Sequence, residues 1–375
     1  MKRTDKINCL LRILWLLPLF LAVACMPRPD ISVEVLPEYE ALFQKENGWT
    51  GADGAYSIML SSNKILWVFG DTWIGQIKDG QHVNAVIVNN SIALQYGKRT
   101  ANSSVEFYYG QTAEGKPAAF LRPPLDHSWF WIYDGAITAK GLFLFLIQIE
   151  RTDEVSVFGF KIIGSWLGHV VNPEEPPTTW HLDIQKIPWA TFSATRITFF
   201  GSALLNLSGF IYIYGITEDI GDDFHRKYMI LARVPEARLG DFNQWRFFAK
   251  DRWSSDYSEA TRLCENMANE YSVSYQPALK KYVVVYSENG ISEKIVARLA
   301  SKPSGPWSEP LLLYRCPEAS WHEDIFCYAA KAHADISLTA DELIITYVAN
   351  SKDFRQIAED ARLYRPRFLR IKFKN

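Results

Sequence analysis

The chain has 375 residues, of which 48% are apolar and 14% aromatic, and 40 Lys and Arg against 42 Asp and Glu leave a formal net charge of −2. This composition excludes extended disorder, which goes with few apolar residues and a high net charge. The near-zero charge also argues against nucleic acid as a partner, because phosphate binding needs a strongly basic surface.

The N-terminal residues are typical of an export signal. Basic residues precede an apolar run over residues 13–24, which is shorter than the roughly 20 residues that a membrane-spanning helix needs. Small residues before Cys25 resemble a bacterial lipobox, so we predict a lipoprotein signal peptide over residues 1–24, lipid on Cys25 and a tether over residues 25–30. The alternative is an ordinary secretory signal cleaved after Ala24. Either signal predicts an exported protein. The lipoprotein reading adds a lipid anchor in a bacterial membrane, facing the periplasm or the cell surface.

Residues 31–375 contain a strand–turn–strand pattern that occurs five times, roughly 70 residues apart. The five hairpins cover residues 53–71, 134–148, 201–216, 270–287 and 333–348, and third strands are expected at residues 84–96, 156–163, 228–234, 294–299 and 367–373. Four-stranded units repeated five times predict one all-β domain, a five-bladed β-propeller. A β-sandwich is the alternative, but it does not predict hairpins at this spacing.

Acidic residues occupy related places in these hairpins. Asp53 precedes the first strand of its hairpin and Asp71 follows the second, while Asp134 and Glu270 open the hairpins of later repeats. In a propeller these positions converge on one axial funnel, and facing carboxylates are what glycoside hydrolysis requires. The alternative for each residue alone is structural, since Asp-Gly is a common turn pair.

The sequence also suggests roles for these carboxylates. Asp53 is predicted to be the ionised base or nucleophile, and Glu270 the proton donor, because its apolar neighbours Met267 and Ala268 would raise its pKa. Asp71 and Asp134 are predicted to tune or orient that pair. No cofactor is expected, although the funnel leaves room for a structural cation on the axis.

Three further residues are candidates for substrate binding. Trp49 and Trp73 flank the acidic motifs and could stack on a sugar, whereas most other tryptophans are expected in the core. His333 is predicted to open the first strand of the last hairpin, near the axis. A satisfied buried histidine is the alternative for His333, as is a metal ligand.

Three cysteines remain beyond the signal region. In an oxidising compartment one pair could be bridged, and Cys316 with Cys327 closes the shortest loop, which would leave Cys264 free. No Cys or His spacing suggests zinc, so no metal site is predicted.

The segment from Gly48 to Gly75, GWTGADGAYSIMLSSNKILWVFGDTWIG, resembles the opening motif of a bacterial family catalogued as domain of unknown function 4185. The asparagine-containing segment 88–92 and the Asn-Glu segment 269–273 resemble later motifs of that family. The resemblance implies a fold like that of five-bladed arabinanase and fructosidase hydrolases, and some family members are endo-D-arabinanases. Asp53, Asp71 and Glu270 match its acidic positions. In the third repeat, however, Phe200-Gly201 stands where the first two repeats have Asp-Gly.

Two function classes follow. The first is an exported glycoside hydrolase, expected as a monomer, acting on a polysaccharide or oligosaccharide that the resemblance suggests contains arabinofuranose. The second is a non-catalytic propeller lipoprotein that binds a glycan or a protein, because a fold does not determine a function.

Overall fold

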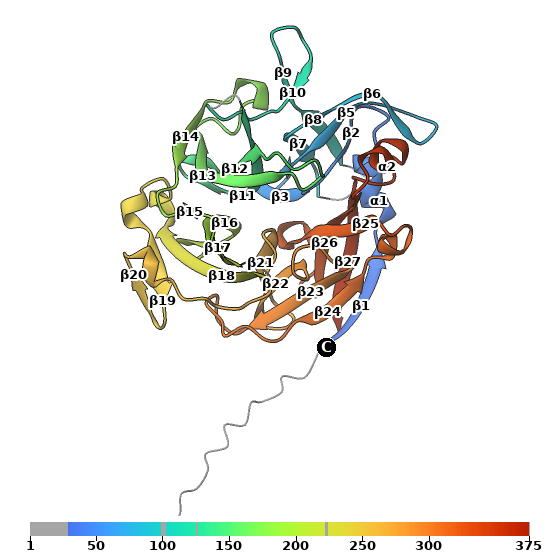
Figure 1. Ribbon diagram of the computed structural model, residues 1–375. Helices are drawn as coiled ribbons and strands as arrows, with labels where there is room; N and C mark the ends of the chain where they lie inside the picture. The colour runs from blue at the N-terminus through green and yellow to red at the C-terminus, as the bar shows by residue number, and fades with distance from the viewer. Residues whose placement is uncertain (1–28, 99–102, 125–126, 222–223, 375) are drawn as a thin grey trace, which may run out of the picture.

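The computed structural model describes residues 29–98, 103–124, 127–221 and 224–374. The predicted signal peptide and the lipidation site Cys25 lie outside these residues. The all-β prediction is confirmed: Figure 1 shows antiparallel sheets that follow one another around a ring.

Five sheets of the described chain have four or more strands, and we number them in chain order. Sheet one contains β3 (Tyr56–Ser61), β4 (Lys64–Phe69), β7 (Ser91–Tyr96) and β8 (Ser104–Tyr108). Sheet two contains β11 (Ser128–Thr138), β12 (Gly141–Arg151), β13 (Phe160–Val170) and β14 (Leu182–Lys186). Sheet three contains β15 (Thr191–Phe192), β16 (Arg196–Leu207), β17 (Phe210–Gly221), β18 (Phe224–Pro235), β19 (Arg246–Ala249) and β20 (Arg252–Ser254). Sheet four contains β21 (Tyr271–Gln276), β22 (Lys281–Ser287), β23 (Lys294–Ala300) and β24 (Leu311–Arg315). Sheet five contains β25 (Ile325–His333), β26 (Glu342–Ser351), β27 (Pro366–Lys374) and β1 (Asp30–Val35).

The remaining elements are short additions to these sheets. The other strands are β2 (Asn47–Ala52), β5 (Thr72–Lys78) and β6 (Gln81–Val88), which form a three-stranded sheet, and the pair β9 (Gly110–Gln111) and β10 (Pro117–Ala118). The helices are α1 (Pro37–Glu40), α2 (Phe354–Glu359) and the 3-10 turns η1 (Ala41–Phe43), η3 (Pro177–Thr179), η4 (Glu236–Arg238), η5 (Phe242–Gln244), η6 (Tyr257–Glu259), η7 (Pro317–Ser320) and η8 (Ala334–Ile336).

The ring closes through two sets of contacts. Strands β3, β11, β16, β21 and β25 contact one another in this order, and β25 contacts β3. The N-terminal strand β1 pairs with the C-terminal strand β27 from Asp30↔Lys374 to Val35↔Leu369. Backbone hydrogen bonds between the two ends of the chain therefore complete sheet five.

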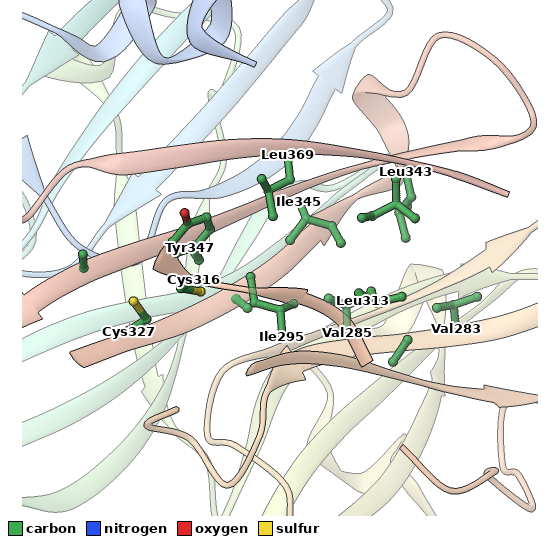
Figure 2. Packing of buried hydrophobic residues seen from close by; sticks show 14 of the residues in the cluster. Val283, Val285, Ile295, Leu313, Cys316, Cys327, Leu343, Ile345, Tyr347 and Leu369 are labelled. Atoms are coloured by element: carbon green, nitrogen blue, oxygen red, sulfur yellow. The ribbon is translucent and has the colours of Figure 1, made fainter. Parts of the chain in front are cut away.

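The hydrophobic core lies between neighbouring sheets. In Figure 2, Val285 of β22 and Ile295 of β23 face Ile345 of β26 and Leu369 of β27, and all four are at most 1% exposed. Middle strands are covered on both faces, so they are apolar at consecutive positions instead of alternating. This explains why β12 is buried continuously over residues 141–149.

Several predicted strand boundaries are wrong. Asp134 lies inside β11 and Gly201 inside β16, so neither opens its strand, and the strand predicted over residues 156–163 begins only at Phe160.

The predicted strand over residues 84–96 is two strands, β6 and β7, in different sheets. The buried Asn90 separates them, since its side chain bonds the backbone of Leu121 and Phe130. In the last repeat the first strand is β25, so His333 ends it instead of opening it. A bulge at Ala329 and Ala330 interrupts this strand, and alanine has a weak β preference.

The cysteines are free thiols in the structure. Cys316 and Cys327 lie near each other in the core between sheets four and five (Figure 2), and no disulfide joins them. Cys264 is free, as expected.

Candidate functional site

Asp53 and Asp71 lie side by side, as the hairpin geometry predicts. Asp53 occupies the turn between β2 and β3, and Asp71 the turn between β4 and β5. The Asp53 amide donates a hydrogen bond to the Asp71 carbonyl at 3.1 Å, and the Gly70 amide donates to the Asp53 carbonyl at 3.1 Å. The backbone therefore holds the two acidic residues together, and both remain partly exposed.

Two tyrosines bind the Asp53 carboxylate. The Tyr328 hydroxyl of β25 donates to Asp53 Oδ2 at 2.6 Å, and the Tyr364 hydroxyl donates to the same oxygen at 3.2 Å. Both donors come from the far end of the sequence, so closure of the ring is needed to assemble this contact.

Different donors bind the Asp71 carboxylate. Trp131 Nε1 of β11 donates to Asp71 Oδ1 at 3.0 Å, and Asn89 Nδ2 donates to it at 3.3 Å. The backbones of Asp53 and Asp71 are thus hydrogen-bonded to each other, whereas the hydrogen-bond donors to their carboxylates come from different parts of the ring.

The surroundings separate the pKa values of these two residues. Burial, followed by the negative charge of Asp71, raises the pKa of Asp53 to about 8, although the bonds from Tyr328 and Tyr364 oppose this rise. Burial raises the pKa of Asp71 to about 6, against the lowering effect of the Trp131 and Asn89 bonds. A neutral carboxylic acid beside an ionised carboxylate is therefore the stable arrangement near neutral pH.

Glu270 lies directly before β21 and is the third acidic group of this site. Burial raises its pKa, as its apolar neighbours predict, while the charges of Lys227 and Lys331 lower it. Its own charge adds to the rise in the pKa of Asp53. Glu270 therefore interacts electrostatically with Asp53.

Asp134 has a different environment. It follows a bulge in β11, and its carboxylate accepts hydrogen bonds from the amides of Gly135 at 2.8 Å and Leu204 at 3.0 Å. Lys331 Nζ lies 3.5 Å from Asp134 Oδ2. Burial raises the pKa of Asp134, but Lys331 and the two amides oppose that rise. Asp134 thus links sheets two and three and serves as a counterion for Lys331.

Lys331 is a buried ammonium at the centre of the ring. Its side chain is 4% exposed, donates to the Tyr133 carbonyl at 2.8 Å and lies 4.2 Å from the centre of the Tyr56 ring. Burial lowers its pKa, while Asp134 and Glu270 raise it. The ammonium of Lys331 thus interacts electrostatically with both Asp134 and Glu270, which the sequence analysis assigns to different repeats.

The three predicted substrate-binding residues are not part of this site, because their side chains are packed in the interior. Trp49 is 1% exposed and stacks on Phe107, and Trp73 is 4% exposed and stacks on His82. His333 is 3% exposed, and its ring nitrogens lie 2.8 Å from Ser57 Oγ and 2.7 Å from Thr346 Oγ1. The satisfied buried histidine is the interpretation that the structure supports.

Sequence reasoning missed Lys331, Tyr328, Tyr364 and Trp131. A lone lysine within the apolar segment over residues 325–333 was an available signal, since an unpaired charge rarely lies in a buried strand. The sequence analysis predicts that the first strand of the last repeat begins at His333, so it did not place Lys331 in a buried strand. Nothing local marks Tyr364, which follows α2 and meets Asp53 only in the closed ring.

In the described part of the chain, no group of three or more His, Cys, Asp or Glu side chains is arranged to hold a metal ion. The ammonium of Lys331 already supplies a positive charge next to Asp134. Among the same residues, no helix is both long and apolar enough to cross a membrane.

A solved structure shares this fold. The crystal structure titled a "putative hydrolase" from Bacteroides ovatus ATCC 8483 aligns with a TM-score of 0.72 at 18% identity, covering 93% of this chain and 97% of that chain. Two lower matches are a thermostable family-43 glycoside hydrolase, with a TM-score of 0.43, 13% identity and coverage of 89% and 96%, and a mutant levansucrase from Bacillus subtilis, with 0.45, 10%, 92% and 85%.

The chain is thus an all-β protein that shares its fold with the Bacteroides ovatus protein. It belongs to the family described as a domain of unknown function (DUF5005), whose model matches residues 37–373. The resemblance to domain of unknown function 4185 is not confirmed by this match. No curated protein matches the chain.

Proposed function

We propose that the chain is a glycoside hydrolase whose site lies on the axis of a five-bladed β-propeller, the five large sheets being its blades. The observation that carries this proposal is the Asp53 and Asp71 pair, which the backbone holds together and whose pKa values are about 8 and about 6. Two carboxyl groups with separated pKa values are the requirement for acid and base roles in glycoside cleavage.

Because the charge of Asp71 raises the pKa of Asp53, we assign the proton shared by this pair to Asp53. Protonated Asp53 gives its proton to the glycosidic oxygen as the bond to the leaving sugar breaks. Ionised Asp71 either removes a proton from the attacking water or attacks the anomeric carbon itself. This differs from the roles predicted from the sequence, in which Asp53 is the base or nucleophile and Glu270 the proton donor. When Glu270 is ionised, its charge adds to the rise in the pKa of Asp53.

The test measures hydrolysis of a broad polysaccharide panel that includes arabinofuranose-containing polymers. Asp53→Asn and Asp71→Asn should each fold normally and lose at least about 10²-fold in turnover, the lower end for removal of a general acid or base. Asp183→Asn changes an exposed carboxylate on β14 and should keep the wild-type rate. A folded Asp53 or Asp71 variant with near wild-type turnover would refute its catalytic role.

A non-catalytic glycan-binding propeller is the second candidate. One observation favours it: in sheet three the chain offers Phe200, Gly201 and Ser202 at the bulge of β16, where sheet two has Asp134. Binding of a glycan by the intact protein, with no cleavage of any polymer in the panel, would select this alternative.

We also retain export and lipid attachment at Cys25 as part of the proposal, with the mature protein acting as a monomer at the bacterial membrane. Cys25→Ser should move the protein from the membrane to the soluble fraction. Unchanged partitioning would leave ordinary secretion as the better interpretation.

A further inference from the structure

A cavity of about 720 Å³ lies at one end of sheet three. Its lining includes Arg196, Asp219, Arg226, Tyr228 and Arg262, together with the hydroxyl side chains of Thr191, Ser193 and Thr195. None of the four axial acidic residues lines it. Among the lining residues that the structure describes, three are arginines and one is a carboxylate, so arginine side chains dominate the charged part of the wall.

Asp219 holds two of the three arginines in place. Arg262 binds this carboxylate through two nitrogens, at 2.7 and 2.9 Å, and Arg196 Nε binds it at 3.1 Å. Partial burial alone would raise the pKa of Asp219, yet its ion pairs with Arg262 and Arg196 lower it. A guanidinium has five N–H donors, so these contacts leave donors for a ligand.

The cavity has an aromatic side as well as a charged one. The Arg262 guanidinium lies 4.3 Å from the centre of the Tyr228 ring. Fixed guanidinium forks, hydroxyls and an aromatic ring are the groups that bind a carboxylate or sulfate carried on a polyhydroxylated ring.

One strand connects this cavity to the axial site. Arg226 and Tyr228 flank Lys227 on β18, and alternation along a strand directs Lys227 to the other face. The charge of Lys227 acts on Glu270. Strand β18 therefore carries two lining residues of the cavity on one face and a charge that acts on the axial site on the other.

We infer that this cavity is a subsite for an acidic sugar, and that the glycan handled by this protein bears carboxylate or sulfate ester groups. The inference rests on the proposed function, because it names the substrate class of that site. The cavity formed by Arg362, Arg365 and Arg367 beside Trp321 is a weaker candidate. It measures about 230 Å³, and two of its arginines are paired to Asp360 and Glu318.

The test measures binding to the Asp53→Asn variant, so that no turnover occurs. Calorimetric titrations use acidic oligosaccharides (uronate-containing and sulfated series), their neutral counterparts of equal length, and inorganic sulfate alone. At least one acidic series should bind at least about tenfold more tightly than its neutral counterpart, and this preference should shrink as salt is raised.

Variants then locate the binding. Arg226→Gln and Arg262→Gln should each weaken acidic-glycan binding about tenfold or more, the loss expected for one charge-assisted hydrogen bond. Arg365→Gln removes an arginine of the other cavity and should leave binding unchanged. Equal affinity for acidic and neutral series throughout, or unchanged binding in both Arg226→Gln and Arg262→Gln, would overturn the inference.

The outcomes separate this inference from the proposed function. Arginine-dependent binding of an acidic glycan without cleavage by the wild-type chain would support the subsite and refute the hydrolase. Cleavage restricted to neutral glycans would support the hydrolase and refute the subsite. Binding of inorganic sulfate with no preference among glycans would mark a simple anion site and also overturn the inference.

Discussion

Asp53 and Asp134 are both followed by glycine, and both lie near the centre of the ring, yet they meet opposite electrostatic conditions. Asp53 faces Asp71 and receives only neutral tyrosine donors, and burial raises its pKa to about 8. Asp134 faces Lys331 and two backbone amides. The difference teaches that two Asp-Gly pairs from different repeats need not share the same chemistry, since the neighbouring charge decides whether a buried carboxylate favours its neutral form or forms an ion pair.

The largest expected effect on stability comes from removing the counterion of Asp134. Lys331→Met should lower the free energy of unfolding by about 3–5 kcal/mol, because it leaves Asp134 as a buried charge without its counterion. The measurement is chemical denaturation at neutral pH. Adding Asp134→Asn to the same chain should restore part of the loss. If the single variant loses less than about 1 kcal/mol, the ion pair is not what satisfies Asp134.

The glycine after Asp53 provides the next test. Gly54 has a φ of +60°, and a Cβ built there would lie 3.2 Å from the Tyr56 ring. Gly54→Val should therefore cost at least about 1–2 kcal/mol in backbone strain, whereas Asp53→Asn keeps the shape and removes only charge. Thermal melts of the two variants compare them directly. Equal stability would contradict the turn geometry at Asp53.

The pH dependence of stability should come from the Asp53 and Asp71 pair. Their pKa values of about 8 and about 6 lie above the ordinary value of 3.8, so the folded state binds more protons than the unfolded state at intermediate pH. Their contribution to stability is therefore complete below about pH 4 and is lost as pH rises toward 8. The melting temperature should fall over this range.

Asp53→Asn serves as the matched variant for this pH profile. Its melting temperature should depend less on pH between 6 and 8, because the group with the higher pKa is absent. Asp134→Asn should keep the slope of the wild type in that interval. A wild-type slope retained in Asp53→Asn would show that another group carries the titration.

The smallest expected effect concerns the tyrosine donors. If Asp71 must be ionised and Asp53 protonated, turnover should show a bell-shaped pH profile with apparent pKa values near 6 and 8 that belong to the pair. Tyr364→Phe removes a donor that lowers the pKa of Asp53, so the alkaline limb should move up by roughly 0.5–1 unit. Tyr39→Phe, whose hydroxyl instead bonds the Lys98 carbonyl, is the control. A downward shift would contradict the donor role of Tyr364.

Local patterns predicted the parts of the structure that depend on neighbouring residues. The hairpins around Asp53 and Asp71 and the rise in the pKa of Glu270 follow from turn residues, apolar runs and adjacent side chains. The last repeat was misplaced because its first strand contains a bulge and two alanines. A bulge breaks the two-residue period that identifies a strand, so the position of His333 could not be read correctly.

The sequence alone determined the all-β class, the hairpin of the first repeat and the association of Asp53 with Asp71, because these arise from residues that are close together in the chain. Tertiary structure decided which carboxylate is paired, where Trp49 and Trp73 are buried, and that Lys331, Tyr328 and Tyr364 belong to the site. The hydrogen bonds of Lys331 to Tyr133 and of Tyr328 and Tyr364 to Asp53 join residues 198 to 311 positions apart. They form only when β25 meets β3 and the ring closes, and burial at that closure sets the pKa values on which the proposed chemistry depends.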